Sequence, residues 1–183
     1  MKAPATVEGR DRLRLFCALK LPRQTVKRIA AWQAEALSSG RVVVPDHLHI
    51  TLAFLGARPA AELAAITAEL RAAAHAAARP VLRLRGYRET RSVGMLVLQD
   101  EGRRATALAA DVHGRLERLG VYRPERRQWL PHVTVLRFRA RPHLRPALPD
   151  LGEVSLSEAA VYHSVLRPTG AQYEVLEAVA LGG

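Results

Sequence analysis

Two short segments of this chain have the same order of residue types: residues 49–52 read His-Ile-Thr-Leu and residues 132–135 read His-Val-Thr-Val. In an extended strand, successive side chains point to opposite faces. Each histidine therefore shares one face with the threonine two residues later, and the apolar residues occupy the other face. Composition alone would produce about 0.07 such tetrads, and two are present.

Two histidines that face one cleft can act as general base and general acid, because an imidazole titrates near pH ~6.5. Cleavage of a phosphodiester needs this division of labour: a base removes a proton from water while an acid protonates the departing alkoxide. Thr51 and Thr134 would donate hydroxyl hydrogen bonds to the non-bridging phosphate oxygens. The tetrads thus predict an acid/base site at His49 and His132, although their symmetry does not order the two roles.

The sequence predicts no metal and no cofactor. Asp46, His47 and His49 are close together, but coordination requires three or more convergent ligands and no carboxylate or cysteine cluster accompanies them. In a regular strand His47 would share the face of His49, beside the site. A phosphate-binding Gly-x-x-x-x-Gly-Lys-Ser/Thr loop is absent from the sequence. Surface or core roles are favoured for the remaining histidines: His75, His113, His143 and His163.

The charge of the chain favours a polyanionic partner. The 183 residues carry a formal net charge of +11, and the sequence pI is about 11.1. Nucleic acid is the commonest partner of such a protein. Nearly all the basic residues are arginine, which suits bidentate phosphate contacts, although a genome-wide composition bias could also produce this excess.

The order strand, helix, tetrad occurs twice. A strand-like segment at 13–19 and helical spacing from Pro22 to Leu37 precede the first tetrad, and segments 93–98 and 108–119 precede the second. The halves match in length as well as order, which predicts an internal duplication. A third helix is expected at 63–77. Further strands are expected at 81–85, 154–162 and 173–180. Loops are expected at 40–45, 56–60, 100–104, 120–129 and 139–152. The last two loops are rich in Arg and Pro, and are either substrate-contacting or solvated segments.

These elements predict an α+β fold: a bilobal, pseudo-twofold duplicated architecture with mainly antiparallel sheets flanked by helices and a central active-site cleft. We expect residues 1–183 to form a single domain of two intertwined lobes. The lone cysteine, Cys17, alternates with leucines and is expected to be buried and structural. The N-terminal residues lack the apolar segment of a signal peptide and no segment is long enough to span a membrane, so a cytoplasmic location is expected.

The segments around both tetrads resemble the two-histidine phosphoesterase superfamily, and within it the RNA 2',3'-cyclic phosphodiesterases, also called 2'-5' RNA ligases. The resemblance rests on residues 14–19, 47–56, 131–137, 162–166 and 173–176. It implies a metal-independent hydrolase that opens a terminal 2',3'-cyclic phosphate to a 2'-phosphate. It also implies that His49 is the proton donor to the leaving 3'-oxygen and that His132 is the proton acceptor from water. The implied partner is RNA with a cyclic phosphate end, or a related cyclic nucleotide, bound by a monomer.

Two further residues and two further functions stay open. Arg137 lies where the resembling family often carries an arginine, and the resemblance implies that it binds the phosphate, yet regular alternation from His132 would point it away from the site unless the strand bulges or twists. Trp129 could stack a base or pack under its loop. The same residues could instead ligate RNA by the reverse reaction, and a non-catalytic module that binds RNA or nucleotides could keep the same cleft.

Overall fold

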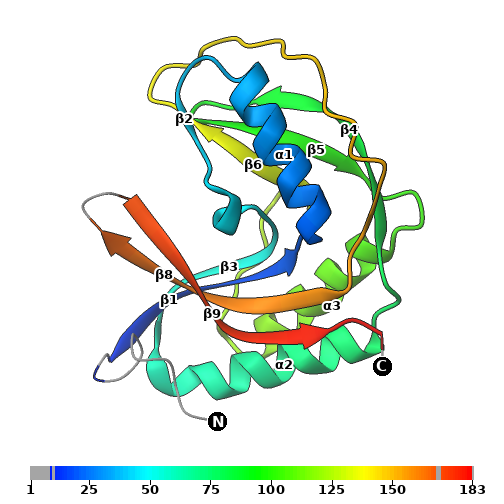
Figure 1. Ribbon diagram of the computed structural model, residues 1–183. Helices are drawn as coiled ribbons and strands as arrows, with labels where there is room; N and C mark the ends of the chain where they lie inside the picture. Colours follow the sequence, from blue (N-terminus) through cyan, green and yellow to red (C-terminus); the bar gives the residue numbers. More distant parts are fainter. Residues whose placement is uncertain (1–8, 10, 168–169, 183) are drawn as a thin grey trace.

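The computed structural model describes residues 9, 11–167 and 170–182, and residues 1–8, 10, 168, 169 and 183 lie outside the described part. The strands form two antiparallel sheets (Figure 1). One sheet has the order β3-β1-β8-β9, with β1 (Arg12–Lys20), β3 (His49–Pro59), β8 (Glu158–Arg167) and β9 (Gly170–Ala180). The other has the order β2-β6-β5-β4-β7, with β2 (Arg41–Val42), β4 (Val81–Glu89), β5 (Val93–Gln99), β6 (His132–Arg137) and β7 (Glu153–Ser155).

The two sheets repeat one arrangement. In the first sheet, the tetrad strand β3 pairs with β1, and β8 and β9 follow; in the second, the tetrad strand β6 pairs with β5, and β4 and β7 follow. Every one of these pairs is antiparallel. The predicted α+β class, antiparallel pairing and duplication are therefore confirmed at the level of topology.

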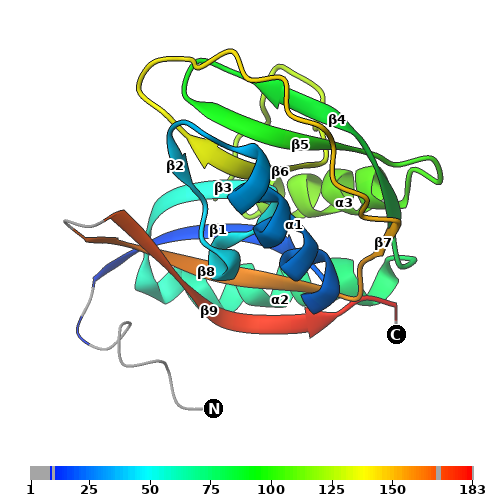
Figure 2. The same ribbon diagram turned by 45° about the horizontal axis from the view of Figure 1, so that its top comes forward.

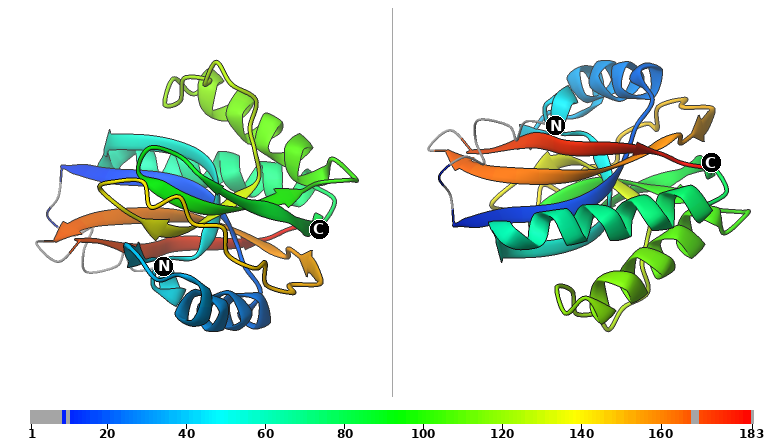
Figure 3. Two further views of the ribbon diagram at one scale, coloured as in Figure 1. Left: turned by 90° about the horizontal axis from the view of Figure 1, so that it is seen from above. Right: turned by 90° about the horizontal axis from the view of Figure 1, so that it is seen from below.

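The helices exchange between the two halves. Helix α1 (Arg23–Ala36) follows β1 but packs on the five-stranded sheet (Figures 1 and 2). The ring of Trp32 on α1 lies 6.2 Å from that of Tyr87 on β4. Helix α3 (Arg104–Arg118) follows β5, yet it lies beside α2 (Leu63–Ala76) on the four-stranded sheet (Figure 3). Each sheet is thus covered by a helix from the other half of the chain.

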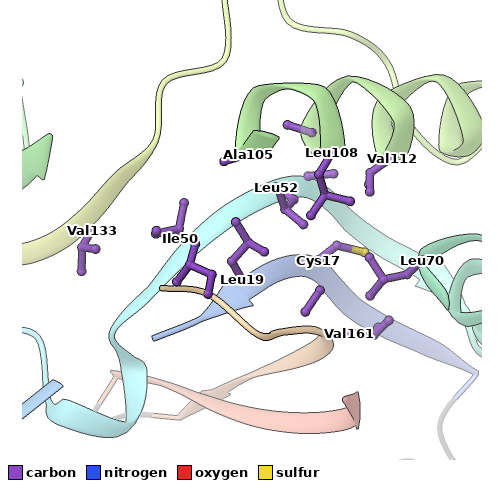
Figure 4. Close-up of a cluster of buried hydrophobic side chains, with 14 of the residues drawn as sticks. Cys17, Leu19, Ile50, Leu52, Leu70, Ala105, Leu108, Val112, Val133 and Val161 are labelled. Atoms are coloured by element: carbon purple, nitrogen blue, oxygen red, sulfur yellow. The ribbon is translucent and has the colours of Figure 1, made fainter. Parts of the chain in front are cut away.

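One cluster of buried apolar side chains joins the two sheets and the three helices. Figure 4 shows part of it: Cys17, Leu19, Ile50, Leu52, Leu70, Ala105, Leu108, Val112, Val133 and Val161. The apolar residues of both tetrads point into this cluster, so burial of one strand face holds the histidines and threonines on the other face. Complete burial raises the pKa of the Cys17 thiol to about 12, which agrees with a structural role.

Three expectations about element bounds were wrong. The expected loop at 40–45 contains the short strand β2, which pairs with β6. The expected loop at 56–60 belongs mostly to β3, which pairs with β1 as far as Pro59 because an extra residue at Leu55 and the positive φ of Gly56 let the strand bend and continue. The expected strand at 154–162 is two strands in different sheets, β7 and β8. Between them, the backbone N–H of Leu156 donates to the Pro80 carbonyl. Within the described residues, the helices are all too short or too polar to cross a membrane.

Candidate active site

A cavity of about 750 Å³ is lined by both sheets. His49 and Thr51 of β3 face it from one side, and Thr134 and Arg137 of β6 face it from the other. His132 is not among the lining residues, but it lies two residues before Thr134 on β6, which contacts β3, and Thr134 lines the cavity. The positive charge of His132 lowers the pKa of His49. None of the described lining residues carries a carboxylate. The tetrads therefore meet at one cleft that suits an anion.

The two histidines are held in the same way. The Nδ1–H of His49 donates to the carbonyl oxygen of His47 at 2.7 Å, and the Nδ1–H of His132 donates to that of Leu130 at 2.8 Å. A carbonyl oxygen only accepts, so Nδ1 carries a hydrogen in both rings and Nε2 is the nitrogen that exchanges protons. Nε2 of His49 accepts a hydrogen bond from the Thr51 hydroxyl at 3.1 Å.

Each tetrad strand has a β-bulge at the fourth residue of the tetrad. In β3, Thr51 pairs with Ala18 and Ala53 pairs with Cys17, which leaves Leu52 as the extra residue. In β6, Val135 is the extra residue by the same criterion. A bulge shifts the alternation of side chains by one residue. The side chain of the fifth residue after each histidine consequently faces the cavity. This residue is Phe54 in β3 and Arg137 in β6.

The bulge in β6 therefore removes the objection that regular alternation raised against Arg137 as a substrate-binding residue. Two consecutive residues before it, at 135 and 136, are buried, and Arg137 itself is exposed and lines the cavity. The sequence shows the alternation but not the bulge, because the bulge is set by pairing with β5 and not by the local residues.

The carbonyl of each bulge residue accepts a hydrogen bond from a helix of the other half. Nε2–H of His113 on α3 donates to the Leu52 carbonyl at 2.7 Å, and the Gln33 amide on α1 donates to the Val135 carbonyl at 2.8 Å. Gln33 also donates to the Val43 carbonyl at 3.0 Å. The Val135 carbonyl also accepts a hydrogen bond from the backbone N–H of Val43 at 3.0 Å. The hydrogen bonds from Gln33 and His113 add to the stability of the bulges that orient the site. Sequence reasoning missed Gln33; its only signal is a glutamine on the buried face of its helix.

Replacement of Gln33 by leucine is expected to lower the free energy of unfolding by about 1–3 kcal/mol, because two hydrogen bonds worth about 0.5–1.5 kcal/mol each are lost and the Val135 carbonyl keeps only the backbone N–H of Val43. Urea denaturation of the variant and of the wild type measures this change. Gln24→Leu is the matched control, since Gln24 is exposed on the same helix. Equal effects of the two substitutions would contradict the role given to Gln33.

Burial determines the charge of His49. The ring lies 4.9 Å from that of Phe16 and 5.5 Å from that of Tyr173. Loss of solvent lowers the pKa of His49 to about 4, helped by the positive charges of His132, His47 and Arg137 and opposed by the hydrogen bond to the His47 carbonyl. His49 is therefore neutral at pH 7 while the cavity holds no anion.

Two other residues singled out in the sequence have clear positions. His47, in the 3₁₀ turn Pro45–His47, flanks the site and lies 4.4 Å, ring to ring, from Tyr173. Trp129 donates its indole N–H to the Thr51 carbonyl at 2.9 Å and packs against the core instead of lining the cavity, which favours the packing interpretation. Sequence reasoning missed Phe54, whose ring is 49% exposed at the cavity with the Arg14 guanidinium 4.9 Å from its centroid.

The loops at 120–129 and 139–152 contribute no described residue to the cavity. The second loop is anchored by the buried carboxylate of Glu89, which accepts hydrogen bonds from the backbone N–H groups of His143 and Leu144 and from Arg141. Among the remaining histidines, His75 is exposed on α2 and His163 is buried in β8. The residues that the structure describes contain no group of three or more potential metal ligands.

Comparison with known proteins identifies the family. The family model described as the 2'-5' RNA ligase superfamily matches residues 21–166. An RNA 2',3'-cyclic phosphodiesterase of Thermus thermophilus is 34% identical over 182 residues, which covers 93% of this chain and 91% of that protein.

Two solved structures agree with this match. The crystal structure of E. coli LigT complexed with 3'-AMP has a TM-score of 0.79 at 26% identity and covers 94% of this chain and 99% of LigT. The crystal structure of TT0787 of Thermus thermophilus has a TM-score of 0.81 at 30% identity, with coverage of 93% and 99%. The chain belongs to the 2'-5' RNA ligase superfamily.

Proposed function

We propose that this protein hydrolyses the 2',3'-cyclic phosphate at the end of an RNA to a 2'-phosphate, with His49 and His132 as its acid/base pair. The observation that carries the proposal is the repeated geometry of the tetrads: each imidazole is oriented by a carbonyl two residues earlier, and His49, Thr51 and Thr134 of the two tetrads line one cavity that has no carboxylate among its described residues. The name of the Thermus relative and the 3'-AMP bound to LigT support the same class of substrate.

The proposed reaction is a single displacement at phosphorus. Nε2 of His132 accepts a proton from water while the water oxygen forms a bond to phosphorus and the bond to the 3'-oxygen breaks. Nε2–H of His49 donates a proton to that 3'-oxygen, which leaves a 2'-phosphate and a 3'-hydroxyl. Thr51, Thr134 and Arg137 bind the non-bridging oxygens as their charge grows. These steps use side chains alone, and we propose that no metal takes part.

The proton on His49 depends on the substrate in this scheme. The pKa of about 4 makes His49 neutral in the free protein, whereas a donor must start protonated. An anionic phosphate beside the ring favours the imidazolium and raises this pKa. The opposite assignment, with His49 as base, gives the same pH dependence, because one proton is shared by the pair in either case.

A change of leaving group separates the two assignments. We compare each variant with the wild type on the normal cyclic substrate and on one in which sulfur replaces the 3'-oxygen. The fold-loss caused by His49→Ala is expected to be at least about 10 times smaller on the sulfur substrate, because a thiolate leaves without a proton. His132→Ala is expected to lose the same activity on both substrates. Single-turnover rates measure the comparison. Rescue of His132→Ala instead of His49→Ala would reverse the roles.

The proposal is tested with an RNA oligonucleotide that ends in a 2',3'-cyclic phosphate, incubated with the purified protein in EDTA. The expected product ends in a 2'-phosphate, and His49→Ala and His132→Ala lose it while the matched control His75→Ala retains it. RNA binding without turnover would contradict the proposal and favour a binding module. The superfamily description makes ligation the second candidate. A 2'-5' linked product after addition of a 5'-hydroxyl RNA would support that activity.

We also propose that residues 1–183 act as one domain, as a monomer and in the cytoplasm. The apolar cluster shared by the two sheets and the exchanged helices support a single cooperative unit. An RNA substrate supports the cytoplasm.

A further inference from the structure

Two arginines face each other across neighbouring strands at the cavity. Arg41 on β2 is the direct partner of Arg137 on β6, and both line the cavity. Residues directly opposite in an antiparallel pair have Cβ atoms about 5 Å apart, where like charges destabilise the sheet. Phosphates of a substrate bound beside the two guanidinium groups offset this repulsion.

Arg41 also reaches the other sheet. A Cβ atom added to Gly170, the first residue of β9, would lie only 2.6 Å from Nη1 of Arg41. The guanidinium group therefore lies against the glycine backbone, in space that a side chain at this position would fill. Arg41 thus borders the cavity between the short strand β2 and the start of β9, and is separated along the strands from the tetrads.

The charge of the cavity exceeds the charge of one cyclic phosphate. Arg14, Arg41 and Arg137 line it, and none of the described lining residues is acidic. A nucleoside 2',3'-cyclic phosphate has a single negative charge, and Thr51, Thr134 and Arg137 already bind that group in the proposed reaction. The guanidinium group of Arg41 is therefore suited to a second phosphate of the same substrate.

We propose that Arg41, the cross-strand neighbour of Arg137, forms a subsite for the phosphate on the 5' side of the terminal nucleotide, while Arg137 stays with the reacting phosphate. This inference rests on the proposed function. It makes the substrate an RNA end or a 5'-phosphorylated cyclic nucleotide in preference to a cyclic nucleoside phosphate alone. Arg41 is a specificity residue in this account, because it touches a part of the substrate that does not react.

The test compares three substrates: adenosine 2',3'-cyclic phosphate, the same compound with a 5'-phosphate, and an adenylyl dinucleotide that ends in a 2',3'-cyclic phosphate. The wild type is expected to show a kcat/KM about 10–100-fold higher for the two substrates with a second phosphate, the size of one charge-assisted contact. The preference should fall as salt is raised. A gain for the dinucleotide alone identifies the internucleotide phosphate, and a gain for both identifies any phosphate on the 5'-oxygen; both results support the subsite.

Arg41→Gln is expected to remove this preference through KM, with at most a few-fold change for adenosine 2',3'-cyclic phosphate. Arg41→Lys should retain part of the preference, because it keeps the charge but loses the bidentate geometry. Arg23→Gln is the matched control, since Arg23 is exposed on α1 and does not line the cavity. Circular dichroism confirms that each variant is folded.

Equal kcat/KM values for the three substrates in the wild type would overturn the subsite. An equal loss on all three substrates in Arg41→Gln would also overturn it and would assign Arg41 to the reacting phosphate. Absence of turnover on every substrate is the failure of the proposed function instead. In that case, equilibrium binding of adenosine 2',5'-bisphosphate against adenosine 2'-phosphate decides the subsite, and equal affinities would refute it.

Discussion

Alanine in place of His49 or His132 is expected to lower kcat for cyclic-phosphate hydrolysis by about 10²–10⁴-fold, because each removes one proton transfer from the transition state. The double variant should lose far less than the product of the two single effects, since the two groups act as a unit. Steady-state kinetics on an RNA end with a cyclic phosphate measures the losses.

Affinity for the product separates catalysis from binding in these variants. Binding of adenosine 2'-phosphate should fall much less than kcat, because Thr51, Thr134 and Arg137 remain in the cavity. His75→Ala is the control, since His75 is exposed on α2 away from the cavity. A variant that loses either tetrad histidine and keeps kcat within a few-fold of the wild type would contradict the acid/base pair.

The stability of the protein is expected to fall as the pH is lowered from about 6.5 to about 4, because His49 is buried in its neutral form. Its pKa is about 4 in the folded protein and ~6.5 in the unfolded chain, so the unfolded chain takes up the proton first as the pH falls. The contribution is complete above pH ~6.5 and is lost toward the folded pKa. Its size is on the order of 2–3 kcal/mol.

Urea denaturation between pH ~7 and ~4.5 measures this dependence, and His49→Gln should flatten it. His47 has a pKa lowered by burial as well, so His47→Gln is the matched comparison and is expected to retain most of the dependence. Parallel pH curves for the wild type and His49→Gln would show that His49 is not the buried neutral group described above.

The duplication could be predicted because it depends on local patterns. Strand and helix periodicity, and the faces on which His49 and Thr51 lie, follow from alternation within a few residues. The position of Arg137 could not be predicted in this way, because the bulge at Val135 is a property of the pairing between β5 and β6. Regular alternation gave the wrong face for that reason.

The side chains that support the site could not be found in the sequence either. Gln33 and His113 contact the bulges only because their helices pack on the opposite sheet. Along the sequence, His113 is 61 residues from Leu52, and Gln33 is 102 residues from Val135. A glutamine on the buried face of a helix is a weak signal on its own. Similarly, Phe54 belongs to an apolar strand by pattern, and only the bulge at Leu52 brings its ring to the cavity.

Hydrolysis of adenosine 2',3'-cyclic phosphate in H₂¹⁸O with EDTA, followed by ³¹P NMR, tests the central claim most directly. The account predicts a 2'-phosphomonoester that contains one ¹⁸O atom on phosphorus, formed by the wild type and not by His132→Ala. A 3'-phosphate product, or turnover that EDTA abolishes, would contradict the two-histidine mechanism.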